Sequence, residues 1–266
     1  MNWDLFVQKC VQAGLAGVEC LSGIPGTVGA VPIQNVGAYG QEVAQTIIRV
    51  ECLHKATLKT KAFTASECLF AYRDSIFKCN DNPWIILNVK FRLKTELPEI
   101  RYGELKNSLN HKLLDHLSLQ DKLAIVREQV IVLRRGKGMV LSNEDPNTVS
   151  AGSFFKNPTL DKKEYSQFLA TCEQLNLGKV PSYPNGEQTK IAAAWLIEQS
   201  GFTKGQIYKG IKISDYHALA LVNIRGNTAE LAEFVELIRS QVYNQFGLLI
   251  EPEPVWYNTD GQRINF

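Results

Sequence analysis

The stretch "SGIPGTVGAVPIQNVGAYG", residues 22–40, holds five glycines and two prolines and carries no charged residue. Glycine and proline at this density exclude a regular helix, and the segment is too apolar for a solvated loop. We interpret it as a buried multi-turn segment in which glycine lets the backbone approach a ligand. Its spacing matches neither a P-loop nor the dinucleotide fingerprint, so a tight loop without a ligand is the alternative. The amides of Gln34 and Asn35, with Tyr39 nearby, favour a flat, polar-edged ring with a diphosphate tail.

The composition is that of an ordinary soluble globular protein: 266 residues, 45% hydrophobic and 21% charged, enough for one large or two smaller domains. The net charge of +2 predicts neither a nucleic-acid partner nor an anionic membrane partner. The six cysteines lack the spacing of a zinc site, which indicates reduced thiols in a cytoplasmic protein and no metal. No apolar run reaches the roughly 18 residues that a membrane span needs.

Apolar periodicity predicts a mixture of helices and strands before residue 136. Helices are expected over residues 3–13 and 118–135, and strands over 46–54, 57–64 and 84–93. Gly14 ends the first helix, and Ser118 with Asp121 three residues later begins the second. Thr64 and Glu67 have the spacing of a capping box, which predicts a helical turn after the second strand.

The second half of the chain also mixes the two periodicities. Helices are expected over residues 160–176, 190–200 and 227–246, and strands over 217–224, 248–251 and 255–257. Asn227 and Glu230 give the last helix a capping box. A polar stretch places a domain boundary between about residues 136 and 150. The fold class predicted from these patterns is α+β.

Two basic stretches could bind anions. In "FAYRDSIFK", residues 70–78, Arg73 beside aromatic residues is suited to hold a carboxylate through two hydrogen bonds, although an exposed Arg–Asp turn is the alternative. Arg134, Arg135 and Lys137 end a helix, where they either complement its dipole or bind an anion.

Two further stretches place a hydroxyl and two carboxyl groups in unusual surroundings. In "AGSFFKNP", residues 151–158, Ser153 lies between a glycine and two phenylalanines, as either a turn residue or a reactive hydroxyl. In "LIEPEP", residues 249–254, Glu251 and Glu253 point to one face of a predicted strand. They either protect a sheet edge or, if buried, orient or protonate a reacting group.

Together with "YGEL" at residues 102–105 and "KIAAAWLIEQSG" at 190–201, these stretches resemble the UDP-N-acetylenolpyruvoylglucosamine reductase (UDP-N-acetylmuramate dehydrogenase) family. The motifs occur in the family's order from about Gly14 to Tyr257, and the ordered set is highly specific. The "YRDSIFK" loop resembles the first of the family's two types.

The resemblance implies a flavoenzyme that uses FAD and NADPH to reduce UDP-N-acetylglucosamine enolpyruvate to UDP-N-acetylmuramate for cell-wall peptidoglycan. Residues 1–135 are then part of an FAD-binding domain of the vanillyl-alcohol-oxidase (PCMH) type. Residues 150–246 form a substrate-binding domain, and residues 247–266 return toward the active site.

The resemblance also implies roles for single residues. Arg73 matches the family's active-site arginine, Ser153 its proton donor and Glu253 its active-site glutamate. Positions that match contacts to the nucleotide sugar or to NADPH phosphates are Tyr72, Tyr102, Lys137, Asn157, Tyr183 and Lys204. Positions that match the flavin-binding segment are Ile24, Pro25, Gly26, Gly29, Ala30, Gln34, Asn35, Gly37, Ala38, Tyr39 and Gly40.

The resemblance lacks one part of the family's pattern. Family members carry roughly 85 further residues before this start, with a glycine-rich segment for the FAD diphosphate, and residues 1–13 do not resemble it. The implied chain is therefore a fragment, the product of a mis-started gene, or a non-catalytic remnant that binds a nucleotide sugar or a protein without FAD. A related flavin oxidase of small alcohols or sugars is a third alternative, but such an oxidase has no use for a proton donor at Ser153.

Overall fold

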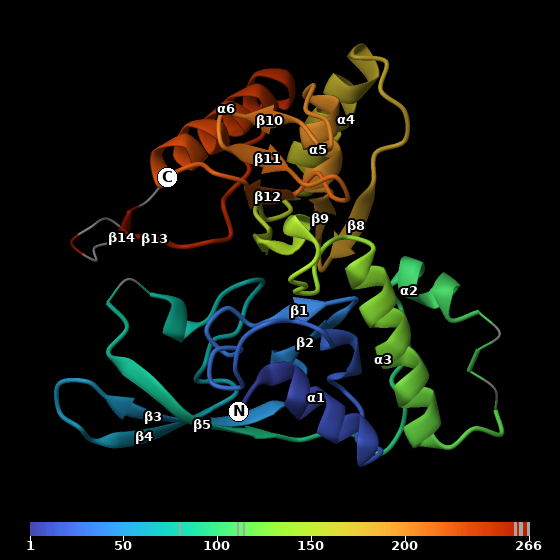
Figure 1. Ribbon diagram of the computed structural model, residues 1–266, viewed down its shortest axis with the longest axis vertical. Helices are drawn as coiled ribbons and strands as arrows, with labels where there is room; N and C mark the ends of the chain where they lie inside the picture. Colours follow the sequence, from blue (N-terminus) through green and yellow to red (C-terminus); the bar gives the residue numbers. More distant parts are fainter. Residues whose placement is uncertain (80, 111, 114, 258–259, 261–262, 265–266) are drawn as a thin grey trace. The chain divides into compact units, whose positions relative to one another are not determined.

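Antiparallel strand pairs accompanied by helices make up both parts of the chain, which confirms the predicted α+β class (Figure 1). The computed structural model describes residues 1–79, 81–110, 112–113, 115–257, 260 and 263–264. The chain divides into two units, Met1–Val140 and Leu141–Phe266, each with its own hydrophobic core.

A three-stranded sheet forms one part of the first unit. The central strand β3 (Ile47–His54) pairs with β4 (Thr60–Thr64) on one side and with β5 (Trp84–Phe91) on the other. The predicted pairing of the first two strands is thus confirmed. Val50 of β3 is fully buried and lies opposite Phe63 and Val89, so this face of the sheet packs into the core.

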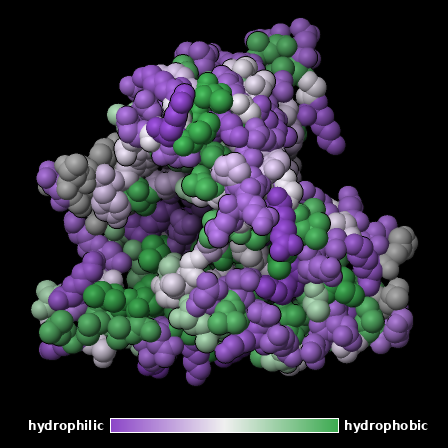
Figure 2. Space-filling model, in the orientation of Figure 1, coloured by the Kyte–Doolittle hydropathy of each residue, from purple (hydrophilic) through white to green (hydrophobic). Residues whose placement is uncertain are grey.

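Strand β5 exposes apolar side chains to solvent. Ile85 and Leu87 are 47% and 57% exposed, and β5 is an edge strand among the described residues. Figure 2 shows apolar side chains gathered over the outer end of this sheet, where Leu58 is also exposed. An apolar edge of this kind favours self-association.

Helices α1 (Trp3–Gln12) and α3 (Leu119–Arg135) lie close to their predicted positions. The carboxamide of Asn2 accepts the Leu5 N–H at the start of α1, and the Ser118 hydroxyl accepts the Asp121 N–H at the start of α3. Helix α2 (Gly103–Ser108) was not predicted, because six residues are too few to establish an apolar period. Thr64 and Glu67 exchange the bonds of a capping box, and the Cys68 N–H donates to the Thr64 carbonyl, so the predicted helical turn is confirmed.

The glycine-rich segment consists of turns and short elements. After the 3-10 helix η1 (Glu19–Leu21), turns lead to the hairpin of β1 (Gly37–Ala38) and β2 (Gln41–Glu42), followed by the 3-10 helix η2 (Val43–Gln45). A further 3-10 helix, η3 (Ile76–Lys78), follows the Arg73 turn. The prediction of an irregular segment is confirmed, but the expectation that it is buried was wrong in part, because Pro25, Gly26, Thr27, Ala30, Ile33 and Gly40 are exposed.

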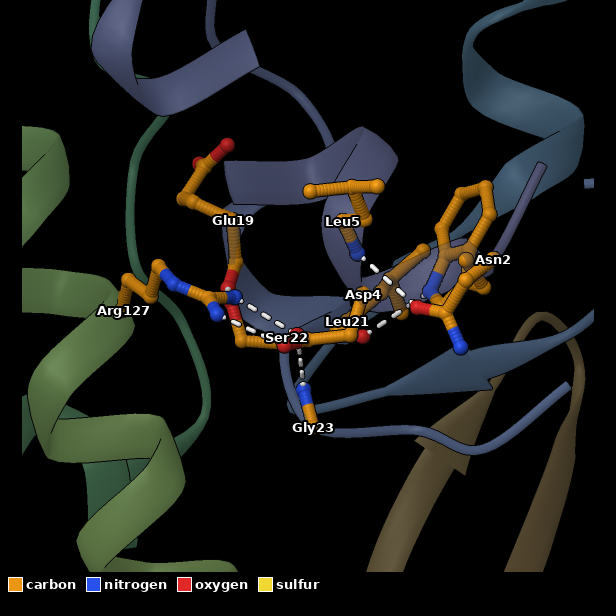
Figure 3. Close-up of polar contacts among 9 residues, drawn as sticks. Asn2, Asp4, Leu5, Glu19, Leu21, Ser22, Gly23 and Arg127 are labelled. Atoms are coloured by element: carbon orange, nitrogen blue, oxygen red, sulfur yellow. Dashed lines mark hydrogen bonds and ion pairs between the residues drawn. The ribbon is translucent and has the colours of Figure 1, made fainter. Parts of the chain in front are cut away.

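Asp4 fixes the start of this segment (Figure 3). Its carboxylate accepts two hydrogen bonds of 2.7 Å from the Arg127 guanidinium and one of 2.6 Å from the Gly23 N–H. The hydrogen bond from Arg127 is the main cause that lowers the pKa of Asp4, although partial burial opposes it. One side chain therefore joins α1, α3 and the entrance of the glycine-rich segment.

We expect Asp4→Asn to lower the free energy of unfolding at pH 7 by about 2 kcal/mol, because hydrogen bonds to a charged group are lost. The folded pKa is depressed, so the ionised carboxylate stabilises the fold fully above the ordinary aspartate pKa near 3.9 and progressively less as the pH falls through the lower folded value. Urea unfolding between pH 7 and pH 3 measures the difference, with Glu128→Gln on the exposed side of α3 as the control. Equal acid losses in wild type and Asp4→Asn would contradict this role.

The second unit contains a four-stranded sheet, a three-stranded sheet and a two-stranded sheet near its C-terminal end. The four-stranded sheet has the order β10 (Ile207–Tyr208), β11 (Ile211–Ile213), β12 (Ala220–Asn223) and β6 (Ser150–Ser153). The three-stranded sheet has the order β7 (Thr159–Leu160), β9 (Gln188–Ile191) and β8 (Ser182–Asn185).

The helices of the second unit are η4 (Pro146–Thr148), α4 (Lys162–Gln174), α5 (Ala193–Gln199) and α6 (Thr228–Phe246). The predicted capping box of α6 is confirmed, because Asn227 and Glu230 exchange both hydrogen bonds.

One predicted helix boundary and one predicted strand in this unit were wrong. The helix expected from residue 190 begins only at Ala193, because residues 188–191 pair as β9. The strand expected over 248–251 is absent from these described residues: Gly247 ends α6 with a φ of +68°, and pairing begins at Pro252 opposite Phe155. Strand β13 (Trp256–Tyr257) forms as expected and pairs with β14 (Arg263–Ile264).

Positions 258–259, 261–262 and 265–266 of the predicted C-terminal return lie outside the described residues. All six cysteines are free thiols. In the described part of the chain, no helix is long and apolar enough to cross a bilayer, and no cluster of His, Cys, Asp or Glu side chains could hold a metal ion.

Candidate active site

Arg73 sits at the tip of a tight turn in the first unit. Ala71 and Asp74 exchange two backbone hydrogen bonds of 3.1 and 3.2 Å, and Arg73 between them has a φ of +56°. A left-handed conformation at a residue other than glycine or asparagine costs free energy and often marks a functional site. The side chain donates from Nη2 to the Gly37 carbonyl at 2.8 Å, and Cζ lies 5.3 Å from the centre of the Tyr72 ring. Arg73 and Tyr72 are therefore held together on the hairpin of β1 and β2.

Gly37 is the residue that lets Arg73 approach this closely. A Cβ atom at position 37 would lie 2.8 Å from Glu42 Cγ, 2.9 Å from the Gln41 carbonyl and 3.1 Å from Arg73 Nη1. Carbon atoms in proteins do not approach backbone oxygen that closely, so glycine is required here. The glycine-rich segment and the arginine loop are separate motifs in the sequence, but in the structure the contact between Gly37 and Arg73 joins them.

Tyr39, Tyr102 and Lys137 gather in a second cluster of the same unit. The rings of Tyr39 and Tyr102 meet edge to face with 5.2 Å between their centres. Lys137 Nζ lies 5.7 Å from the centre of the Tyr39 ring and 2.5 Å from a carboxylate oxygen of Glu104. Burial raises the pKa of Tyr39, so its phenol stays protonated and can donate a hydrogen bond. The structure thus brings a predicted flavin residue next to two predicted nucleotide contacts.

Arg134 differs from the other basic residues at the end of α3 because it is only 8% exposed. Its Nη2 donates to the Met139 carbonyl at 2.8 Å, while Nε is buried without a hydrogen-bond partner among the described residues. Gly23 lies against it, since a Cβ at that position would be 3.6 Å from Arg134 Nε. A buried guanidinium beside the glycine-rich segment raises the positive potential there.

The glycine-rich segment has exposed backbone that could hold a cofactor. Among the described residues of the glycine-rich segment, Pro25, Gly26, Thr27 and Ala30 are exposed although none is charged. Gly26 has a φ of +121° and open space where a side chain would lie, so a ligand can approach the backbone there. The charge of Arg134 beside Gly23 suits an anionic group.

Ser153 ends strand β6 in the second unit. It lies opposite Ala220 of β12, and Gly152 before it has a φ of +74°. The Phe154 N–H donates to the Leu219 carbonyl at 2.7 Å. Phe154 and Phe155 are 3% and 1% exposed and belong to the hydrophobic core. Ser153 is half-buried and is followed at once by two residues of the hydrophobic core.

The "IEPEP" stretch runs beside this serine. The Glu253 N–H donates to the Phe154 carbonyl at 2.7 Å, and the Lys156 N–H donates to the Glu251 carbonyl at 2.8 Å. Phe155 and Pro252 form the bridge between these two bonds. Glu253 thus takes the position across from the neighbour of Ser153. Nothing in the local sequence of either stretch predicted this pairing.

The two glutamates of this stretch have different surroundings. The carboxylate of Glu251 is 70% exposed and forms a 3.0 Å ion pair with Lys156. Glu253 is only partly exposed. The sequence pattern could not distinguish them, because residues two apart on a strand share a face.

The remaining predicted contacts of the second unit lie in three separate segments, of which only that of Tyr183 is a strand. The Asn157 side-chain oxygen accepts the Ala193 N–H at 2.9 Å and so caps α5. Tyr183 on β8 is 46% exposed. Lys204 Nζ lies 4.0 Å from Glu198, with 48% of its side chain exposed. The roles of these three residues stay predictions.

Comparison with known proteins gives consistent matches. The family described as "UDP-N-acetylenolpyruvoylglucosamine reductase, C-terminal domain" matches residues 145–257. A UDP-N-acetylenolpyruvoylglucosamine reductase of Thermobifida fusca is 47% identical over 262 residues, which cover 96% of this chain and 72% of that protein. The protein of the same description from Salinispora arenicola is 45% identical over 264 residues, with 96% and 70% covered.

A solved structure shares the fold. The crystal structure of UDP-N-acetylenolpyruvylglucosamine reductase from Thermus caldophilus matches with a TM-score of 0.62 and 23% identity, covering 95% of this chain and 68% of that one. At this identity the likeness speaks for the fold alone, while the 47% identity to the Thermobifida protein decides the family. The chain belongs to the UDP-N-acetylenolpyruvoylglucosamine reductase family.

Proposed function

We propose that this chain reduces UDP-N-acetylglucosamine enolpyruvate to UDP-N-acetylmuramate, with FAD as cofactor and NADPH as reductant, in the synthesis of peptidoglycan precursors. The backbone pairing that brings Glu253 opposite Phe154, the residue after Ser153, is the observation that carries the proposal, because it brings two distant stretches of the chain together. The names of the similar proteins support the substrate.

When bound, FAD supplies the chemistry of accepting a hydride from NADPH and delivering it to the substrate. The glycine-rich segment would hold it, with Tyr39 and the exposed backbone around Gly26 on its surface. Arg134 beside Gly23 would favour its diphosphate electrostatically.

Arg73 stabilises the charge that develops on the substrate. After hydride reaches the methylene carbon of the enolpyruvyl ether, negative charge appears on the neighbouring carbon and spreads into the carboxylate. A guanidinium held in advance by the Gly37 carbonyl lowers the barrier to this step without having to reorganise. The left-handed conformation of Arg73 is consistent with a residue held for function.

Ser153 delivers the proton that completes the reduction. Its hydroxyl gives a proton to the carbon that bears the carboxylate, and the oxygen must then recover a proton from solvent or a relay. The buried phenylalanines after it limit the access of water. Lys156 is engaged by Glu251, so a relay through Lys156 would first have to break that ion pair.

Glu253, in the same unit of the chain as Ser153, assists the reaction. It orients a side chain or a water molecule beside the substrate. Tyr72, Tyr102, Lys137, Asn157, Tyr183 and Lys204 contact the nucleotide sugar or the NADPH phosphates in this proposal.

A visible absorbance spectrum of the purified chain tests the function. We expect FAD added to the chain to co-elute on gel filtration, its absorbance near 450 nm to bleach with NADPH, and the colour to return under anaerobic conditions only after the enolpyruvyl nucleotide sugar is added. UDP-N-acetylglucosamine without the enolpyruvyl group is the control. Bound flavin that the enolpyruvyl compound does not reoxidise would contradict the proposed substrate, and failure to bind flavin would contradict a flavoenzyme.

A further inference from the structure

Asn35 lies in the predicted flavin segment, yet its side chain is used inside the protein. It is 1% exposed and has a φ of +45°. Its Nδ2 donates to a carboxylate oxygen of Glu42 at 2.8 Å and to the Ala71 carbonyl at 3.0 Å, and its Oδ1 accepts the Ala44 N–H at 3.1 Å. Both amide hydrogens and one acceptor site are therefore engaged.

The bond to Ala71 reaches the base of the Arg73 turn. The Ala71 carbonyl accepts the Asp74 N–H that closes this turn and also the Asn35 amide. On the other side of the turn, the Ser75 hydroxyl donates to the Ile33 carbonyl at 2.7 Å. Residues 33–35 thus tie down both ends of the four-residue turn.

The side chain of Arg73 is held by the same hairpin. Its Nη2 donates to the carbonyl of Gly37, two residues beyond Asn35. Glu42 closes the network, because it accepts from Asn35 and lies over Gly37, where a Cβ would be 2.8 Å from Glu42 Cγ. The backbone and the guanidinium of Arg73 are therefore both positioned from one short stretch.

We propose that Asn35 is a positioning residue for Arg73 and that it serves the reaction through this network without a direct hydrogen bond to the flavin. The inference rests on the proposed function for the role of Arg73. A buried amide with both hydrogens engaged has none to offer a cofactor, whereas loss of its bond to Ala71 would free the turn.

Asn35→Gly is the sharpest variant, because glycine accepts the left-handed backbone and only the amide is removed. In the cofactor-free chain we expect an arginine-specific protease to cut after Arg73 about tenfold faster in the variant, since the turn opens more often. Gln41→Ala is the matched control. Gln41 is 8% exposed and bonds to Glu19 and Cys20, so its loss also removes two buried hydrogen bonds but none to the turn.

The flavin-loaded chain gives a second readout. In Asn35→Gly we expect reoxidation by the enolpyruvyl substrate to slow by about 30- to 100-fold, while flavin reduction by NADPH changes less than about threefold. Combined with Arg73→Lys, the Asn35 substitution should add little, because residues that act through one group are not additive. Asn35→Asp, which keeps the acceptor for Ala44, replaces Asn35→Gly in both assays if that variant does not fold.

Several results would overturn the inference. If the protease cuts after Arg73 at the same rate in Asn35→Gly as in the wild type, Asn35 does not stabilise the turn. Weaker FAD binding with normal reoxidation would make Asn35 a direct flavin ligand, and additive effects of Asn35→Gly and Arg73→Lys would separate the two residues. If the wild-type chain does not turn over the enolpyruvyl substrate, only the proposed function is contradicted. The protease comparison does not depend on turnover and still tests the role of Asn35.

Discussion

Ser153→Ala lowers the rate at which the enolpyruvyl substrate reoxidises the flavin by about 10³- to 10⁴-fold, the loss expected when a proton donor is removed. Flavin reduction by NADPH persists in the variant, because that half of the cycle needs no proton from the enzyme to carbon. The two half-reactions are measured separately by stopped-flow absorbance. Their separation is the reason for expecting an effect on kcat with little effect on NADPH saturation.

The structure supplies a matched control for this prediction. Ser166 is an exposed serine of α4 whose hydroxyl bonds to the Lys162 carbonyl, so Ser166→Ala removes the same group at no cost to the reaction. Ser153 is only half-buried at the end of β6, and its replacement leaves the buried phenylalanines in place. Near-normal reoxidation in folded Ser153→Ala would remove this residue from its proposed role.

Local features of the fold were predictable from the sequence. Ser118 and Asn227 begin helices as expected, because a capping side chain bonds to a backbone group three residues away. The elements that were mispredicted depend on distant partners. Residues 190 and 191 were expected to begin a helix, but they belong to β9, which pairs with β7 and β8. Periodicity within a short window cannot report such pairing.

In the candidate site, too, the sequence predicts residue types but not the contacts with distant residues. Residue types such as Arg73, Ser153 and Glu253 could be picked out because they stand in unusual surroundings and match the family's motifs. Their environments could not, because the pairing that sets Glu253 beside Phe154 joins residues 99 positions apart in chain numbering. Asn35 shows this most clearly, because an amide at this position can face a cofactor or stabilise a turn. The sequence pattern favours the cofactor, whereas the hydrogen bond from Asn35 to the Ala71 carbonyl depends on a residue 36 positions away.

The second large effect is expected for Arg73→Lys, which keeps the positive charge but removes the planar fork that reaches the Gly37 carbonyl. We expect reoxidation by the enolpyruvyl substrate to slow by about 10²- to 10³-fold, because the stabilising charge is no longer held in place. NADPH-driven bleaching should continue. Arg92→Lys is the control, since Arg92 is an exposed arginine after β5 in the same unit.

Gly37→Ala separates the charge of Arg73 from its position. The added Cβ would meet Arg73 Nη1 at 3.1 Å and the Gln41 carbonyl at 2.9 Å, so the guanidinium must move although the arginine is intact. If position decides the rate, Gly37→Ala and Arg73→Lys slow the same half-reaction, and the double variant is little worse than either single one. If charge alone decides it, Arg73→Lys keeps most of the activity and Arg73→Gln loses it. That second result would also remove the reason for the strained turn and for the Asn35 network beneath it.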